Sequence, residues 1–362
     1  MVKNLYEEKN NSKEHRIMAV PALPMEIPHT PMLTNLKTEE SLHSTAGESM
    51  ELLSFESKKT SVLTELKKVT PPKLTILHER TCNCASNHLN CLTAKEWLKS
   101  QLGVWEFYYN GRDVRDKNVH PAVFPLSLAK RVIEVFSHKG ELIIDPFTGI
   151  STSLLAARDL DRNAVGFDIN SKYIEFSKNR LSETALVGTA QQIPILDDAR
   201  NIAQYFEKGV VSLCFTSPPY ANLLNRPRLN KSRRGDQRKN EQYLKVEQYS
   251  QDERDLGMLV MEKYAKAIME IYRDIKPIMK QKGHVVINIP DMWWSTIKYG
   301  KRVPLHIAVY NAMTEAGYEL RNTIIWDRRN IVNGVGIFGY PSNYITMGTT
   351  FEYLMDFWVP PT

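Results

Sequence analysis

Short apolar runs alternate with amphipathic segments along the chain from about residue 92 onward. Apolar runs bounded by Gly, Pro or Asp are typical of strands buried on both faces, and apolar positions three and four residues apart predict helices. We expect strands at 141–144, 164–167, 210–215, 284–289, 321–326 and 352–358. We expect helices at 94–102, 126–136, 151–158, 171–181, 259–275 and 304–316. This alternation predicts an α/β fold with a doubly wound, mostly parallel sheet.

Residues 1–91 differ in pattern from the rest of the 362-residue chain. Prolines punctuate their first part, so we expect an N-terminal extension, partly flexible and accessory, before a single domain at 92–362. No apolar run is long enough to span a membrane, and the charged first residues lack the apolar centre of a signal peptide. We therefore predict a cytoplasmic protein without membrane contact.

The net charge of +6 is concentrated in one stretch. Residues 226–239 include seven basic side chains and only one acid, Asp236. The basic residues are Arg226, Arg228, Lys231, Arg233, Arg234, Arg238 and Lys239. They lie in a predicted insertion at about 221–258, and a focused basic patch favours contact with a polyanion. A solvated surface loop is the alternative for charge alone.

Three thiols and an imidazole occur within ten residues, at Cys82, Cys84, His88 and Cys91. Such a group could bind zinc. The usual two-residue spacing between the first cysteines is missing, and no second ligand cluster follows in the sequence. The sequence therefore favours reduced thiols in a loop, and we predict no metal.

The first turn with candidate chemistry is Asp145-Pro146-Phe147-Thr148-Gly149, between a predicted strand and helix. This is the general geometry of a nucleotide-like binding site. The sequence continues Ile-Ser-Thr, without the further glycines that let a backbone approach a pyrophosphate. The turn therefore favours a cofactor without phosphates, such as S-adenosylmethionine, over a dinucleotide.

Two acids follow at the ends of later apolar segments. Asp168 lies 19 residues after Gly149, where an acid can accept both ribose hydroxyls, although it could instead cap the next helix. Asp198 could accept the amino group of adenine, and its neighbour Asp197 competes for that role.

The second turn is Ser217-Pro218-Pro219-Tyr220, which ends the apolar strand at 210–215. Adjacent prolines end a strand because neither donates to the sheet, and they fix the direction of the preceding carbonyls. The serine hydroxyl and a carbonyl could accept the two N–H bonds of an exocyclic amino group, while the tyrosine stacks on its base. The alternative is a strand-ending turn with a packing tyrosine.

Four motifs in one order resemble the amino-group DNA methyltransferases of restriction–modification type. They are His120–Pro125, Asp145–Gly149, Gly166–Asp168 and Thr216–Tyr220, and the resemblance spans roughly residues 92–358. The resemblance implies a seven-stranded Rossmann-like sheet that binds S-adenosylmethionine at the ends of its first strands. The cofactor contacts that it implies are His120, Pro121, Phe124, Asp145, Pro146, Phe147, Thr148, Gly149, Thr152, Asp168, Ile169, Asp198 and Thr216.

The resemblance also implies a reaction and partners. A serine before Pro-Pro-Tyr leans toward the N4 amino group of cytosine in this family, with Ser217, Pro218, Pro219 and Tyr220 as the catalytic turn. The implied partners are double-stranded DNA and, functionally, a cognate restriction endonuclease. Adenine-N6 methylation and a non-catalytic DNA-binding regulator remain alternatives. A Rossmann oxidoreductase is disfavoured by the missing glycines.

Overall fold

The computed structural model describes residues 71–116, 119–120, 123–182, 189–223, 252–294, 301–330 and 347–361. By its internal contacts the chain divides into two units, residues 1–67 and 68–362. All described residues belong to the second unit, so the predicted N-terminal extension stays a prediction. Within the described residues, no helix has the length and apolar character needed to cross a membrane.

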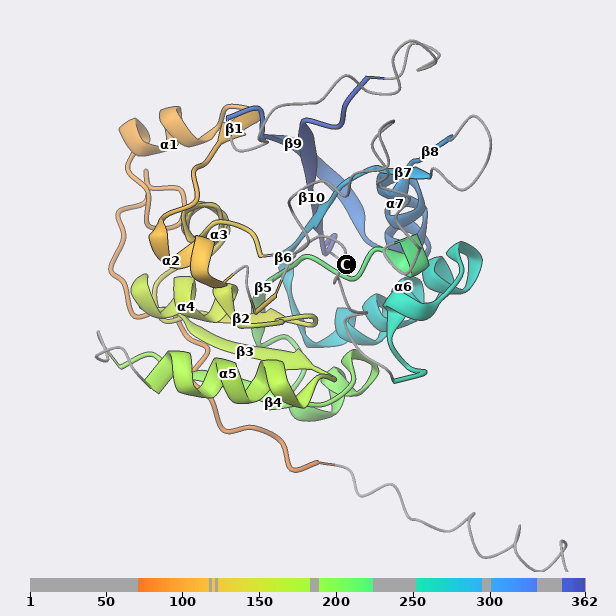
Figure 1. The fold of residues 1–362 in the computed structure, drawn as a ribbon. Coiled ribbons are helices and arrows are strands. Elements are labelled where there is room, and N and C mark those ends of the chain that lie inside the picture. The colour runs from red at the N-terminus through yellow and green to blue at the C-terminus, as the bar shows by residue number, and fades with distance from the viewer. Residues whose placement is uncertain are drawn as a thin grey trace, which may run out of the picture. The chain divides into compact units, whose positions relative to one another are not determined.

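An eight-stranded sheet forms the centre of the second unit (Figure 1). Its strands are β1 (Val104–Glu106), β2 (Leu142–Asp145), β3 (Asn163–Asp168), β4 (Gln192–Leu196), β5 (Val211–Thr216), β6 (Met279–Ile289), β9 (Glu319–Asp327) and β10 (Phe351–Trp358). The spatial order is β1-β9-β10-β6-β5-β2-β3-β4. Among these described strands, β10 alone runs antiparallel to its neighbours, β6 and β9. A separate pair, β7 (Met292–Trp294) and β8 (Lys301–Val303), is antiparallel.

Helices cover both faces of this sheet. The α-helices are α1 (Ala94–Ser100), α2 (Gly111–Asp116), α3 (Leu126–Phe136), α4 (Thr152–Asp159), α5 (Ser171–Ser182), α6 (Met261–Ile275) and α7 (Leu305–Glu315). The 3-10 segments are η1 (Ala199–Tyr205), η2 (Ala221–Leu223), η4 (Leu256–Met258) and η5 (Lys276–Ile278). Figure 1 shows α3 and α4 on one side of the central strands, with α6 and α7 on the other.

The strands are apolar on both faces because each face packs on a different core. In β2, Leu142 and Ile144 pack with α6 and α7, whereas Ile143 packs with α3 and α4. The same alternation occurs in β5, where Cys214 faces the first core and Leu213 the second. Side chains of successive strand residues point to opposite faces, so a continuous apolar run supplies both cores.

The predicted fold class is therefore confirmed, with additions. The expected strands and helices all form within a few residues of their predicted bounds, and β6 begins earlier, at Met279. The eighth strand, β1, pairs with β9 at the sheet edge and was not expected from its three residues. Neither α2 nor the β7–β8 pair was expected, because both lie in short polar or mixed stretches without a clear period.

The topology places three loops side by side. In space β2 lies between β3 and β5, and all three strands are parallel, so their carboxyl ends meet at one edge. The turns after these strands are the Asp145, Asp168 and Ser217 segments. In open α/β sheets this edge is where ligands bind, so the fold brings together motifs that are far apart in sequence.

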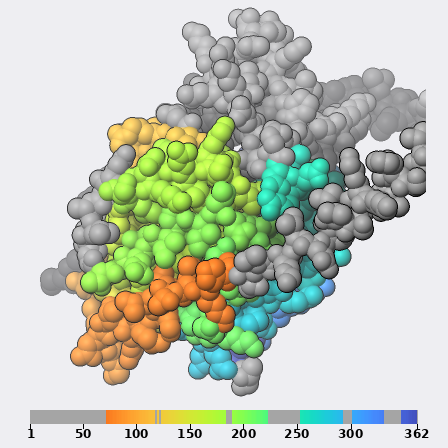
Figure 2. Space-filling view, turned by 90° about the horizontal axis from the view of Figure 1, so that it is seen from below, coloured from red at the N-terminus to blue at the C-terminus, as the bar shows by residue number. Residues whose placement is uncertain are grey.

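The segment before α1 packs against the sheet and its helices within the second unit. Its backbone donates from Leu74 N to Tyr205 O (2.8 Å), and the Ile76 side chain is buried in the core beside α6. In Figure 2 this segment, in orange, lies on the surface next to the green residues of the β4–β5 region. The segment from residue 71 to α1 is therefore part of the same folded unit as the sheet.

Candidate active site

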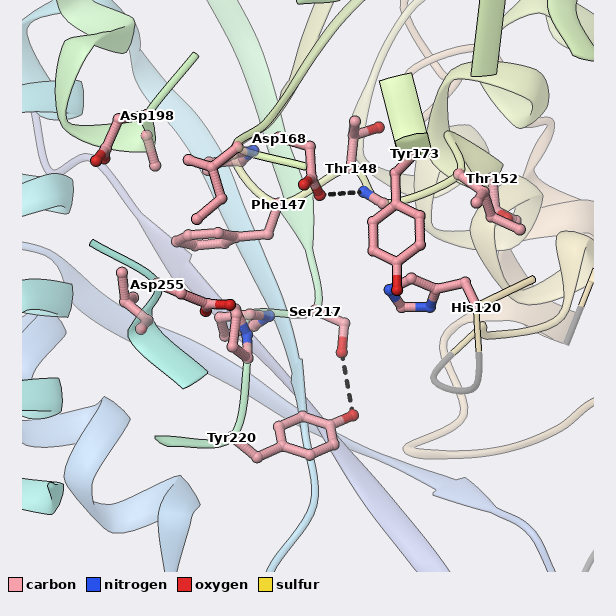
Figure 3. A pocket seen from close by; sticks show the side chains of 18 of the residues that line it. His120, Phe147, Thr148, Thr152, Asp168, Tyr173, Asp198, Ser217, Tyr220 and Asp255 are labelled. Atoms are coloured by element: carbon pink, nitrogen blue, oxygen red, sulfur yellow. Dashed lines mark hydrogen bonds between the residues drawn. The ribbon is translucent and has the colours of Figure 1, made fainter. Parts of the chain in front are cut away.

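A cavity that opens to solvent lies at the carboxyl ends of β2, β3 and β5. Its walls combine the predicted turns with the segment before α3 and the segment at 254–256. In the view of Figure 3, Asp168 lies toward one end, and Ser217 and Tyr220 lie toward the other. The mixed lining of aromatic rings and carboxylates suits a ligand with both apolar and polar parts.

The Asp145 carboxylate lies beneath the cavity and joins its walls. One oxygen accepts hydrogen bonds from Thr216 Oγ1 (2.6 Å) and from Phe147 N (3.1 Å). The other accepts from the Ser153 hydroxyl in the first turn of α4. Burial raises the pKa of Asp145 to about 6, although the bonds from Ser153 and Thr216 oppose the rise. The carboxylate is therefore ionised at neutral pH and fixes β5 to the first turn.

The Asp168 carboxylate defines one wall of the cavity. It accepts from Gly149 N (3.0 Å) and from Asn170 N (2.8 Å), so it both supports the first turn and begins the approach to α5. Burial raises its pKa to about 7. A ribose contact and a role at the start of α5 are therefore compatible. Asp168 accepts hydrogen bonds from backbone N–H groups and still lines the cavity.

Gly149 allows His120 to pack against the turn. Its φ is +51°, and a Cβ at this position would lie 3.2 Å from His120 Nε2. The His120 ring also contacts Tyr173, with ring centroids 4.7 Å apart. Burial lowers the pKa of His120 to about 4, so the imidazole is neutral at physiological pH and adds no positive charge to the cavity.

The start of α4 departs from the glycine-rich form of this turn. Ser151 adopts a φ of +61°, a left-handed conformation that favours glycine. Its backbone N–H donates to Thr148 O (2.8 Å), and its hydroxyl accepts from Thr148 Oγ1 (3.2 Å). From α5, Arg180 donates to Ile150 O (2.8 Å). These contacts hold the turn in shape without a second glycine.

The turn after β5 presents two hydroxyls. Ser217 Oγ and Tyr220 OH lie 3.3 Å apart, within hydrogen-bonding distance, and both side chains are partly exposed to the cavity. The Tyr220 ring packs against the core beside α6. The ring is therefore supported from behind, while its hydroxyl and that of Ser217 point toward each other (Figure 3).

Asp197 and Asp198 both line the cavity, but each already has partners. Asp198 accepts from Arg200 N (3.0 Å) and forms an ion pair with the Arg200 guanidinium (2.8 Å). Asp197 accepts from Asn201 Nδ2 (2.8 Å) and Tyr205 OH (2.7 Å). The geometry therefore leaves the choice between the two acids open.

Most residues predicted from the sequence for the site surround this cavity. Those that line it are His120, Phe124, Pro146, Phe147, Thr148, Gly149, Thr152, Asp168, Ile169, Asp198, Ser217, Pro218, Pro219 and Tyr220. Asp145 and Thr216 lie beneath it and are almost fully buried. Pro121 and the basic residues of 226–239 lie outside the described residues.

The structure adds residues that the sequence did not reveal. Tyr173 projects from α5 beside His120, and Arg254, Asp255 and Leu256 close another wall. Asp255 is buried and accepts from Gly257 N (2.7 Å), which caps η4. Tyr173 lies in the first turn of α5, five residues after Asp168, so its position could have been inferred. The 254–256 segment carries no local motif, and only the fold brings it here.

Comparison with known proteins supports the resemblance seen in the motifs. Residues 38–179 match the family model of the N6/N4 methyltransferases, described as DNA methylase. The Type II methyltransferase M.HpaI of Haemophilus parainfluenzae is 37% identical over 78 residues, which cover 22% of this chain and 25% of that protein. M2.MboI of Moraxella bovis is 35% identical over 85 residues, or 24% of this chain and 31% of that protein.

The similarity is local, because the chain spans only about a quarter to a third of the length of the curated relatives named above. Among solved structures, a putative DNA modification methylase from Thermus thermophilus, complexed with S-adenosyl-L-methionine, is similar at 20% identity. The match covers 46% of this chain and 54% of that one, with a TM-score of 0.30. The resemblance to amino-group methyltransferases of restriction–modification type is confirmed by the family model and the curated relatives.

The hydrogen bond from Thr216 to the Asp145 carboxylate beneath the cavity can be tested by substitution. Thr216→Val keeps the side-chain shape but leaves a buried carboxylate with one donor fewer, which should cost about 1–3 kcal/mol of unfolding free energy. Urea unfolding at pH 8, where Asp145 is ionised, measures this loss. The loss should shrink below pH 6, the approximate pKa of Asp145, because the hydroxyl stabilises the charged form.

Thr314→Val is the matched control, since Thr314 Oγ1 donates to Tyr310 O on an exposed part of α7. It should change stability by less than about 0.5 kcal/mol. Equal stability losses in the two variants would contradict the role of the buried bond.

Proposed function

We propose that this chain is an S-adenosylmethionine-dependent DNA methyltransferase that modifies the N4 amino group of cytosine in duplex DNA. The observation that carries the proposal is the shared cavity: the Ser217–Tyr220 turn and the Asp168 wall open into one space. A methyl donor held beside Asp168 would face an amino group held at the Ser217–Tyr220 turn. The family model, described as DNA methylase, supports the same class of reaction.

The residues at the Asp168 end fit the proposed cofactor. An ionised carboxylate at the end of β3 can accept hydrogen bonds from both ribose hydroxyls. Asp198 or Asp197 would accept the adenine amino group, and Ile169 and Phe147 supply apolar surface beside them. His120 and Phe124 would line the methionine side, together with Pro121 as the motif implies. The neutral His120 suits this side because it would not repel the positive sulfonium.

When bound, the cofactor supplies an electrophilic methyl group on sulfur. The chain's own residues would prepare the nucleophile. An exocyclic amino group is a poor nucleophile because its lone pair is delocalised into the base, and hydrogen-bond acceptors on both of its N–H bonds favour localisation of that pair. Ser217 Oγ and a carbonyl of the Ser-Pro-Pro step would accept these bonds, and the prolines preorganise the carbonyl.

The same turn would hold the base outside the helix. Tyr220 offers a ring supported by the core, and stacking on an aromatic side chain is a common way to hold a flipped base. A cofactor held beside Asp168 would supply the methyl group to the amino nitrogen, and one amino proton would pass to solvent. Orientation of the two reactants in one cavity supplies a large part of the rate enhancement.

Cytosine is favoured by the residue type at position 217. In the family that the motifs resemble, serine before Pro-Pro-Tyr leans toward cytosine-N4 and an acid or amide toward adenine-N6. Adenine-N6 is the second candidate on the same scaffold, and product analysis separates the two.

The proposed partners follow from the same chemistry. The basic residues between Arg226 and Lys239 come directly after the catalytic turn in sequence, so they would contact phosphates beside the flipped base. A cognate restriction endonuclease would be a functional partner, as the resemblance implies. The cytoplasmic location stays a prediction.

Binding of S-adenosylmethionine should depend on pH through Asp168. Its pKa of about 7 in the ligand-free chain means that lowering the pH protonates the carboxylate, which then loses acceptor capacity for the ribose hydroxyls. We expect the dissociation constant, measured by calorimetry, to rise about tenfold from pH 8 to pH 6.

Asp168→Asn should bind more weakly at every pH and lose the component of this dependence centred near 7. Any titration of the cofactor itself would remain in that variant, and a residual dependence centred near 6 would report Asp145. Glu270→Gln, on an exposed part of α6, is the control and should keep the full dependence. An unchanged pH profile in Asp168→Asn would contradict the ribose role.

Transfer to DNA is tested with labelled S-adenosylmethionine and mixed-sequence duplex DNA, followed by mass spectrometry of the nucleosides. We expect N4-methylcytosine. Ser217→Ala should lower the rate about 10²–10³-fold, as expected for the loss of a preorganised polar contact. Tyr220→Ala should also lower the rate, because it removes the ring that stacks on the base. Tyr220→Phe keeps the ring, so it is the matched control and should retain most activity.

N6-methyladenine as the product would select the second candidate. Absence of label in DNA from a folded, cofactor-binding chain would overturn the enzymatic proposal, and would instead favour a DNA-binding regulator.

A further inference from the structure

Four potential metal ligands converge at the edge of the sheet opposite the cavity. They are the thiols of Cys82, Cys84 and Cys91 and the imidazole of His138, and their ligand atoms all lie within 4.8 Å of one another. His138 follows α3, and the turn that it begins leads into β2. The cavity lies at the other end of β2, so this cluster is separate from the candidate active site.

Three separations within the group lie near the edge lengths of a zinc tetrahedron. Cys84 Sγ lies 3.6 Å from Cys91 Sγ, and His138 Nδ1 lies 3.2 Å from Cys82 Sγ and 3.8 Å from Cys91 Sγ. Zinc–sulfur bonds of about 2.3 Å and zinc–nitrogen bonds of about 2.0 Å place tetrahedral ligands about 3.5–3.8 Å apart. The Cys84–Cys91 separation is also far beyond the bond length of a disulfide, about 2.05 Å.

We infer that Cys82, Cys84, Cys91 and His138 bind one structural zinc ion. Three thiolates and an imidazole form a complete four-ligand set, which is typical of structural rather than catalytic zinc sites. The sequence had offered His88 as the imidazole and lacked the usual cysteine spacing. The fold supplies His138 instead, 47 residues beyond Cys91, and His88 is not part of the cluster.

The surroundings of the cluster also fit a charged metal–thiolate group. Lys139 N donates to Cys91 Sγ (3.3 Å), a contact that supports a thiolate ligand from outside the coordination shell. Zinc with three thiolates carries a net charge of −1. Arg80, Arg162, Lys280 and Glu141 all lie close enough to His138 to interact with it electrostatically. Glu141 pairs with Lys280 (3.1 Å), so Arg80 and Arg162 supply the positive charge that would offset the metal–thiolate group.

The cluster lies where the segment before α1 meets the α3–β2 turn. Thr81 N donates to Lys139 O (2.8 Å), and Asn90 Nδ2 donates to Val135 O (2.5 Å). Gly140, at φ +81°, leaves room for this approach, because a Cβ there would lie 2.7 Å from Glu79 O. Most residues of 79–91 are exposed or half-buried, so apolar burial contributes little and a metal would fix the segment.

The test is the metal content of the full chain, purified without chelators and measured by inductively coupled plasma mass spectrometry. We expect one zinc per chain in the wild type and in the control His88→Ala. Cys84→Ser and His138→Ala should each lose most of the zinc. Removal of zinc by a chelator should increase hydrogen exchange in residues 79–92, while exchange in the buried strand β5 stays unchanged.

A cobalt-substituted wild-type chain provides a readout that does not depend on folding of the variants. It should show intense visible d–d bands with sulfur-to-cobalt charge transfer, the spectrum of a tetrahedral thiolate-rich site. Absence of both zinc and this spectrum would overturn the inference, as would a Cys84–Cys91 disulfide in the purified chain. Zinc kept in His138→Ala but lost in His88→Ala would overturn the ligand set. None of these measurements depends on methyl transfer.

Discussion

The buried Asp145 carboxylate is the interaction on which the site depends. It receives hydrogen bonds from the turn after β2, from the first turn of α4 and from the last residue of β5. A buried charge is costly unless it is fully hydrogen-bonded, so these three elements are held in one arrangement relative to one another. The Asp145–Gly149 turn and the Ser217–Tyr220 turn are thereby fixed as two walls of one cavity. Transfer between ligands held by these walls would require little rearrangement of the chain.

Burial also sets the charge state along the cavity. Asp168 and His120 are both buried, and burial disfavours the charged form of each, so the carboxylate pKa rises and the imidazole pKa falls. At pH 7 the Asp168 carboxyl is therefore about half ionised, and the His120 imidazole is neutral. A neutral imidazole does not repel a ligand that brings its own positive charge, as the proposed cofactor does.

Local patterns in the sequence predicted the parts of the fold that are locally determined. Buried strands such as β5 are continuous apolar runs, and the Asp168 and Ser217 turns follow directly from where those runs end. Contacts between distant segments were not predictable in this way. Asp255 reaches the cavity only because η4 packs beside η2, the segment after the Ser217 turn, where Asn222 N donates to Leu259 O (3.0 Å). His138 meets Cys82 only because a turn 56 residues away folds back beside it. The imidazole nearest in sequence, His88, was consequently the wrong candidate partner for the thiols.

The most direct test of the central claim is a crystal structure of the chain bound to sinefungin, a non-reactive analogue of the proposed cofactor. The account predicts ribose oxygens within about 3.2 Å of the Asp168 carboxylate. It also predicts that the amine replacing the methyl group points toward Ser217 and Tyr220, with the Thr216–Asp145 bond intact. An analogue bound outside this cavity, or bound with its reacting end turned away from Ser217, would contradict the account.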